Sequence, residues 1–166
     1  MQVLMVAHSY PLYPGDSTAP FVDAIARGVV CRGHDVTVLL PYHPQFGQPD
    51  GDGLRFLSYR YSPIRSVAPW GFGQTFGPTA GIRASTAAAL PTVAISLYHA
   101  LRRELRSGRY DLVHTHWIIP NGTFAAVAGR DRDVPLVVTM HGSDVAVAER
   151  HRALARVARW AFSKTD

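Results

Sequence analysis

One motif in the second half of the chain gathers an imidazole, an indole and an amide. It consists of His116, Trp117 and Asn121, which follow an apolar segment that predicts a strand. Such groups would supply hydrogen bonds and an apolar platform to a polyhydroxylated ligand such as a sugar. We expect His116 and Trp117 to lie past the end of the strand and to face a cleft.

The pair His114 and His116 makes a metal site geometrically possible, because side chains two residues apart on a strand point to the same side. The sequence offers no third ligand nearby. Core packing is therefore the preferred interpretation of His114, and the sequence predicts no metal site.

A second motif, His141-Gly142-Ser143-Asp144, follows another apolar segment. Gly142 would let the backbone approach a ligand closely. Ser143 or Asp144 could cap the next helix, and for Asp144 a capping role and a ligand-binding role stay equally open. At the end of its strand, His141 is expected to face the same cleft as the first motif.

The loop after the first apolar segment contains Gly15, Asp16 and Ser17. It lacks the G-x-G-x-x-G fingerprint of dinucleotide-binding domains, and the chain has no phosphate-binding G-K-[ST] motif. The N-terminus of the helix that follows could still receive an anion. Taken alone, the loop is more simply interpreted as an ordinary turn with Thr18 as the helix N-cap.

The elements that must position these motifs alternate along the chain. Five apolar segments predict strands, at residues 2–7, 35–40, 54–60, 110–115 and 135–141. Helical periodicity predicts helices over about 18–33, 85–107, 121–129 and 147–162. Such alternation is typical of an α/β doubly wound parallel sheet, for which we predict the strand order 3-2-1-4-5. The three motif loops should then open at one edge of the sheet.

Composition supports a single folded domain. The chain has 166 residues, of which 47% are hydrophobic and 17% charged, which excludes a disordered chain. The single cysteine, Cys31, excludes an intramolecular disulfide and a cysteine-based zinc site. With no signal peptide and no apolar run of about 18 residues, a cytoplasmic location is expected. Because the chain stops after a helix, where another strand would be expected, residues 1–166 are interpreted as one Rossmann-like domain, incomplete at its C-terminal end.

Two features raise the question of membrane contact. The Gly- and Pro-rich segment 62–81 carries aromatic side chains that could touch a lipid surface, namely Trp70, Phe72 and Phe76. The last predicted helix carries a stripe of arginines that we interpret as a solvated face, namely Arg152, Arg156 and Arg159. The net charge of +5 is compatible with an anionic partner but does not identify one.

The ordered motifs VLMVAHSYPLYPG, APFVDAIARGVVCRGHDVTVL, YDLVHTHWIIPNG and PLVVTMHGSDV together resemble the amino-terminal domain of family-4 glycosyltransferases. These are retaining enzymes of the GT-B fold, which is Rossmann-like. The resemblance extends from residue 2 to about residue 162. It implies the acceptor-side domain of a hexosyltransferase-type enzyme.

For the donor side, the resemblance implies specific roles. Gly15 matches the glycine that approaches the donor diphosphate, with Asp16 and Ser17 beside it, although Pro14-Gly15-Asp16 stands where many relatives have a Gly-Gly pair. His141 matches the catalytic histidine that reaches the donor sugar. The same turn would complete the donor side through Gly142, Ser143 and Asp144.

On the acceptor side, the resemblance places His116, Trp117 and Asn121. It implies a nucleotide-sugar substrate, a carbohydrate or lipid-linked acceptor, peripheral contact with the inner face of the membrane, and neither a cofactor nor a metal. No nucleic-acid partner is predicted. Without the family's carboxy-terminal donor domain, this chain alone should be inactive and could self-associate.

Two other functions remain open from the sequence. One is a stand-alone sugar-binding or membrane-docking module that acts with a separate partner chain. The other is a flavodoxin-like binding or regulatory domain, for which Ser17 and Thr18 after the first strand give only slight support.

Overall fold

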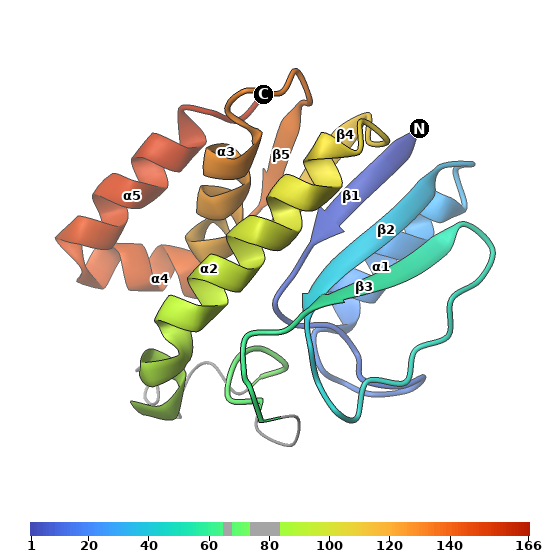
Figure 1. Ribbon diagram of the computed structural model, residues 1–166, viewed down its shortest axis with the longest axis horizontal. Helices are drawn as coiled ribbons and strands as arrows, with labels where there is room; N and C mark the ends of the chain where they lie inside the picture. Colours follow the sequence, from blue (N-terminus) through green and yellow to red (C-terminus); the bar gives the residue numbers. More distant parts are fainter. Residues whose placement is uncertain (65–67, 74–83) are drawn as a thin grey trace.

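The computed structural model describes residues 1–64, 68–73 and 84–166 (Figure 1). Five parallel strands form one sheet in the order β3-β2-β1-β4-β5, which confirms the predicted fold class and strand order. The strands are β1 (Gln2–Val6), β2 (Asp35–Pro41), β3 (Leu54–Tyr59), β4 (Leu112–His116) and β5 (Leu136–Thr139). Their carboxyl ends share one edge of the sheet.

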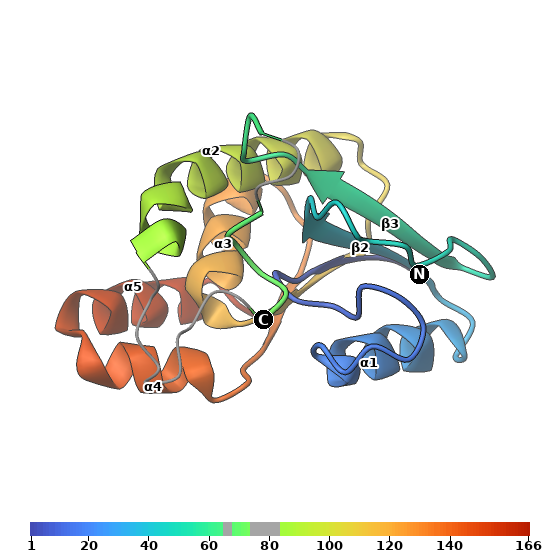
Figure 2. The same cartoon turned by 90° about the horizontal axis from the view of Figure 1, so that it is seen from below.

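Helices cover both faces of this sheet. They are α1 (Pro20–Val30), α2 (Ala84–Arg106), α3 (Thr123–Gly129), α4 (Ser143–Arg150) and α5 (Arg152–Phe162). Figure 2 shows α1 on one face and α2 on the other. Because side chains alternate along a strand, Met5 packs in the cluster that contains α1, whereas Leu4 packs with α2 and α3. Both side chains are fully buried, so β1 lies at the centre of a three-layer structure.

The start of α1 differs from the predicted one. Thr18 does not cap the helix; Ala19, in the left-handed region at φ 46°, occupies that position without a side-chain hydrogen bond. The Thr18 hydroxyl donates instead to the Asp16 carboxylate, at 3.1 Å. The predicted N-cap was wrong because the loop carries a carboxylate that competes for the hydroxyl.

The predicted helix over 147–162 is two helices. The chain is extended at His151, with φ −129° and ψ 100°, which ends α4 and begins α5. The apolar periodicity continues across this corner, so the pattern alone gave no sign of the break. An irregular turn, Ile118–Gly122, likewise precedes α3 where a helix from residue 121 was predicted.

The aromatic side chains near residue 70 are not available to a membrane. Trp70 is 3% exposed and Phe72 is 6% exposed, and both pack in the core. The lipid contact that the sequence left possible is therefore not made by these two residues. Their segment instead packs over the end of β1, where the Phe72 backbone N–H donates to the backbone oxygen of His8. Phe76 lies outside the described residues.

Among the described helices, α2 is the one long and apolar enough to cross a membrane by length and composition. One of its faces packs against the sheet, where Val93, Leu97 and Leu101 are at most 1% exposed. We therefore interpret α2 as a core helix.

The strand β5 forms one edge of the described sheet. Backbone groups alternate in direction along a parallel strand, and at Leu136 they point outward and bind Asp166. The side chains of Val137 and Met140 beside this edge are 38% and 48% exposed. We expect residues 1–166 to self-associate with rising concentration, because apolar side chains are exposed beside this edge strand. Val137→Lys should weaken this association; a constant monomer mass by light scattering would argue against an adhesive edge.

Candidate functional site

Three histidines line up at the carboxyl ends of β4 and β5. The Nδ1 atom of His116 lies 2.8 Å from the Nε2 atom of His141, and the two rings are nearly parallel. The ring of His114 stacks on that of His116 with 4.7 Å between the centroids, and the His114 Nε2 atom hydrogen bonds to Thr139 Oγ1. The structure thus joins the two predicted motifs through a direct contact between imidazoles.

The expected position of His116 is wrong. The strand β4 continues through this residue, so its side chain is fully buried and does not face a cleft. Asn121 is also fully buried, and its Nδ2 atom donates to the backbone oxygen of His116 at 2.9 Å. These two residues lie beneath the surface and support the groups above them.

Trp117 occupies a strained backbone position directly after β4, at φ 65°. Such a conformation costs a large side chain on the order of 1–3 kcal/mol and is found mostly at functional sites. Two contacts hold it: the backbone N–H donates to Thr139 O at 2.9 Å, and the indole N–H donates to Ser143 Oγ at 3.1 Å. The strain and these contacts turn the indole toward the loops of the candidate site.

A cavity of about 350 Å³ lies above β1, between its following loop and the start of α4. Hydroxyls, imidazole and aromatic rings line it together, which suits a polyhydroxylated ligand. Its lining includes His8, Ser9, Ser17, Phe21, Trp117 and Ser143. Three residues predicted from separate motifs therefore meet here, namely Ser17, Trp117 and Ser143.

His8 is a site residue that the sequence analysis missed. It is 4% exposed, and its ring centroid lies 4.1 Å from that of Trp117. Burial, and secondarily the nearby His141, lowers the pKa of His8 to about 3. The signal was present in the sequence, because His8 follows β1 at the same sheet edge where the other motifs end.

His141 is half-buried at the rim of this region. Its ring packs against Phe21 at 4.4 Å and Trp117 at 4.5 Å between centroids. Burial lowers the pKa of His141, against an opposing effect of Asp144, and burial with the neighbouring His114 lowers the pKa of His116 to about 3. Both imidazoles are therefore neutral at neutral pH.

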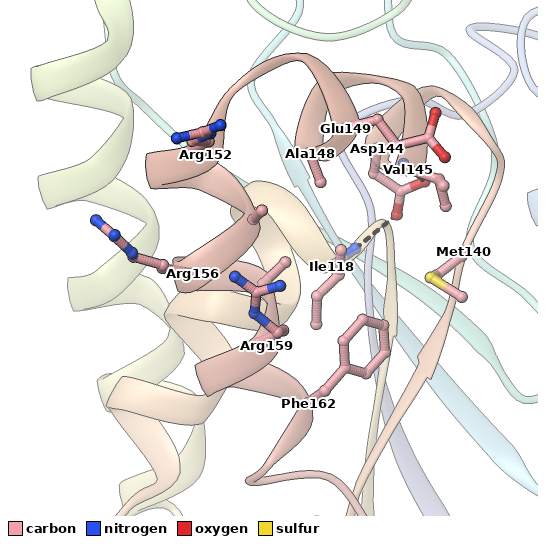
Figure 3. Close-up of a pocket in the computed structure, with 12 residues that line it drawn as sticks. Ile118, Met140, Asp144, Val145, Ala148, Glu149, Arg152, Arg156, Arg159 and Phe162 are labelled. Atoms are coloured by element: carbon pink, nitrogen blue, oxygen red, sulfur yellow. Dashed lines mark hydrogen bonds between the residues drawn. The ribbon is translucent and has the colours of Figure 1, made fainter.

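The carboxylate of Asp144 ties the two motifs together. It accepts the backbone N–H groups of Ile118 at 2.9 Å and of His141 at 3.3 Å, and the first of these bonds is drawn in Figure 3. Asp144 is only 2% exposed. The sequence left Ser143 or Asp144 as a possible N-cap of α4, but Gly142 takes that position at φ 82°.

The first loop contributes less to the cavity than the resemblance implied. Gly15 is exposed at φ 89°, and Asp16 does not line the cavity. The Asp16 carboxylate accepts the backbone N–H of Leu12 at 2.7 Å and those of the Thr18 backbone and hydroxyl. These bonds, led by that to Leu12, lower the pKa of Asp16. Asp16 thus holds the loop in shape.

A separate groove of about 620 Å³ runs between α4 and α5 (Figure 3). Its lining is largely apolar and includes Ile118, Met140 and Phe162. The three arginines of α5 are exposed, as expected, and also line this groove; they have no acidic partner within the part of the chain that the structure describes. None of the four histidines near the cavity lines the groove.

A family model and a protein from Bacillus subtilis both match this chain. The family model of the glycosyl transferase 4-like domain matches residues 18–166. A Bacillus subtilis protein named as a teichuronic acid biosynthesis glycosyltransferase, TuaC, is 49% identical over 37 residues, which are 22% of this chain and 10% of TuaC. The match therefore spans a small part of that relative.

Two solved structures are similar in outline. The C-terminal domain of a Pyrococcus furiosus hydrogenase has a TM-score of 0.51 at 15% identity, over 82% of this chain and 89% of that domain. A UGT transferase from Siraitia grosvenorii, in complex with UDP, has a TM-score of 0.48 at 15% identity, over 93% of this chain and 27% of its own. The hydrogenase match reflects the fold alone. The family model, by contrast, covers most of the chain, and this chain therefore belongs to the glycosyl transferase 4-like family.

Proposed function

We propose that this chain forms one wall of a site where a retaining hexosyltransferase moves a sugar from a nucleotide-sugar donor to a carbohydrate or lipid-linked acceptor. Family membership supports the transfer chemistry. The observation that carries the site is the half-buried His141, which is held between Phe21 and Trp117 beside a cavity with hydroxyl groups.

In this proposal, the neutral His141 imidazole hydrogen bonds to the transferring sugar. Ser17 and Ser143 line the cavity next to the N-terminus of α1, where an anionic diphosphate would be favoured. Trp117 is only 6% exposed but lines the cavity, where the acceptor would contact its apolar ring. His116 and Asn121 act from below, because neither reaches the surface of this chain.

The rest of the donor site would come from a carboxy-terminal domain, whether on the same chain or on a partner. Without it, this chain should not transfer sugar, because a single wall does not exclude water. The described residues hold no group of three or more His, Cys, Asp and Glu side chains able to bind a metal. We propose that amides and basic groups, and no metal of this chain, stabilise the leaving diphosphate.

A cytoplasmic location with peripheral membrane contact is a further part of the proposal. With Trp70 and Phe72 buried, such contact would fall to the exposed face of α5, where Trp160 is 43% exposed. Arginines on that helix would attract an anionic lipid surface.

The test of the site is His141→Ala in an enzyme that contains this chain together with its donor domain. The imidazole is half-buried beside the cavity, so turnover should fall by at least about 10-fold, or about 1.4 kcal/mol of transition-state stabilisation. The melting temperature should also fall, because the change removes the hydrogen-bond partner of the buried His116 Nδ1 atom. Turnover of UDP-, GDP- and ADP-linked sugars is followed by mass spectrometry of the product.

His151→Ala is the matched control, because His151 is exposed and lies at the corner between α4 and α5. It should leave turnover unchanged. If His141→Ala instead keeps its activity while melting several degrees lower, His141 is a structural residue and the proposed site is wrong.

A further inference from the structure

We propose that His116 is a positioning residue that fixes the His141 imidazole in the tautomer with its proton on Nδ1, so that His141 offers an N–H donor to the ligand. The ligand of this inference is the sugar of the proposed function. The tautomer itself is a property of this chain and can be measured without any ligand.

The hydrogen bond between the two rings sets the problem. The His116 Nδ1 atom and the His141 Nε2 atom are 2.8 Å apart. A neutral imidazole carries one N–H and one bare nitrogen, so one ring must donate and the other must accept. Whichever nitrogen holds the shared proton also decides what the outer nitrogen of His141 can do.

Burial decides between the two arrangements. The Nε2 atom of His116 is buried, with no hydrogen-bond partner among residues 1–64, 68–73 and 84–166. An orphaned buried N–H is rarer than an orphaned acceptor, so this nitrogen should be the bare one. The proton of His116 then lies on Nδ1 and is donated to His141 Nε2. The proton of His141 must therefore be on its Nδ1.

The surroundings keep His116 neutral and fixed. Burial and the adjacent His114, His141 and His8 all disfavour its charged form. The Asn121 side chain donates to the backbone oxygen of His116, and the His114 ring stacks on the His116 ring. His116 therefore donates from Nδ1. The other tautomer, with the proton on Nε2, would leave a buried N–H without an acceptor.

The consequence concerns how His141 meets its ligand. Its Nδ1 atom has no hydrogen-bond partner within the described residues, and the ring is half-buried at the rim. An N–H there donates to a hydroxyl oxygen of a sugar and does not remove a proton from it. His141 would thus orient the ligand, while His116 acts through His141 without touching the ligand.

The test is an NMR measurement of tautomers in this chain, labelled with ¹⁵N at its eight histidines. Long-range ¹⁵N–¹H correlations at pH 7.5 distinguish a protonated from a bare ring nitrogen, and single substitutions assign the signals. We expect Nδ1–H on both His116 and His141. If His141 of the unmodified chain is protonated on Nε2, this observation by itself overturns the proposal.

Two variants separate positioning from packing. In His116→Asn, the amide can donate from about the place of Nδ1, so His141 should keep the Nδ1–H tautomer. In His116→Leu, the donor is lost, and His141 should shift toward Nε2–H. An unchanged His141 tautomer in a folded His116→Leu chain would refute a positioning role; if that variant does not fold, the unmodified spectrum and His116→Asn decide.

Activity gives an independent readout in the enzyme with its donor domain. His116→Leu should lower kcat by about 5-fold or more, with little change in KM, and the loss should be smaller for His116→Asn. If His141→Ala leaves turnover intact, the proposed function fails while the tautomer result stands. If His141 has the opposite tautomer but His141→Ala lowers turnover, only this inference fails.

Discussion

Acidification from pH 7 to pH 5 should lower the free energy of unfolding of this chain by about 4 kcal/mol, mainly through two buried histidines. The pKa values of His8 and His116 are lowered to about 3 in the folded chain, from an ordinary 6.5, chiefly by burial. Between pH 7 and pH 5 these two imidazoles bind protons in the unfolded chain but stay neutral in the folded chain. Stability therefore falls as the pH falls below 6.5, by about 1.4 kcal/mol per pH unit for each group.

Three other histidines have pKa values shifted in the same direction. Burial also lowers the pKa values of His43, His114 and His141, so each adds to the loss in acid. The carboxylates with lowered pKa values, Asp16 and Asp131, titrate below their ordinary 3.8. The range from pH 7 to pH 5 thus isolates the histidines.

Urea unfolding at half-unit steps of pH measures this slope. His116→Asn should remove about 1.4 kcal/mol per pH unit of it, because one of the two strongly shifted groups is gone. His151→Ala is the matched control, because His151 is exposed. A free energy of unfolding that stays constant between pH 7 and pH 5 would show that His8 and His116 also bind protons in the folded chain over this range.

The fold was largely predictable because the determining signals are local. Short apolar segments such as Gln2–Val6 are buried on both faces, and alternation with helices selects a parallel sheet. The misjudged points are those that hydrophobic periodicity does not encode. The corner at His151 interrupts a continuous apolar pattern, and the hydroxyl of Thr18 is taken by Asp16. No spacing rule in the sequence contains that information.

The sheet edge that carries the candidate site could be predicted, but which of its side chains are buried could not. Topology alone brings the motifs after β1, β4 and β5 to one edge, which explains why Ser17, Trp117 and Ser143 meet. Whether a side chain at that edge faces outward depends on one residue of strand length. Because β4 extends through His116, its imidazole is buried, and the half-buried ring is that of His141.

Gly71→Ala should destabilise the chain strongly, by about 3 kcal/mol or more, through close backbone approach and φ. A Cβ atom at Gly71 would lie 2.1 Å from the backbone oxygen of His8 and 3.0 Å from Pro41 Cγ. The residue also adopts φ +82°, which L residues avoid. The same His8 oxygen accepts the backbone N–H of Phe72 at 3.0 Å, so a shift of the segment breaks this bond.

Gly73→Ala is the matched control, because Gly73 has φ +77° but nothing within 4 Å of its added Cβ. It should show only the backbone cost, on the order of 1–2 kcal/mol, so that the difference between the two variants measures the close approach. Denaturant unfolding compares them, and the NMR signals of Trp117 and His141 should move in Gly71→Ala but much less in Gly73→Ala. Equal losses would mean that the segment yields without disturbing β1. The position of His8 against Trp117, and with it this wall of the cavity, would then not depend on the segment around Gly71.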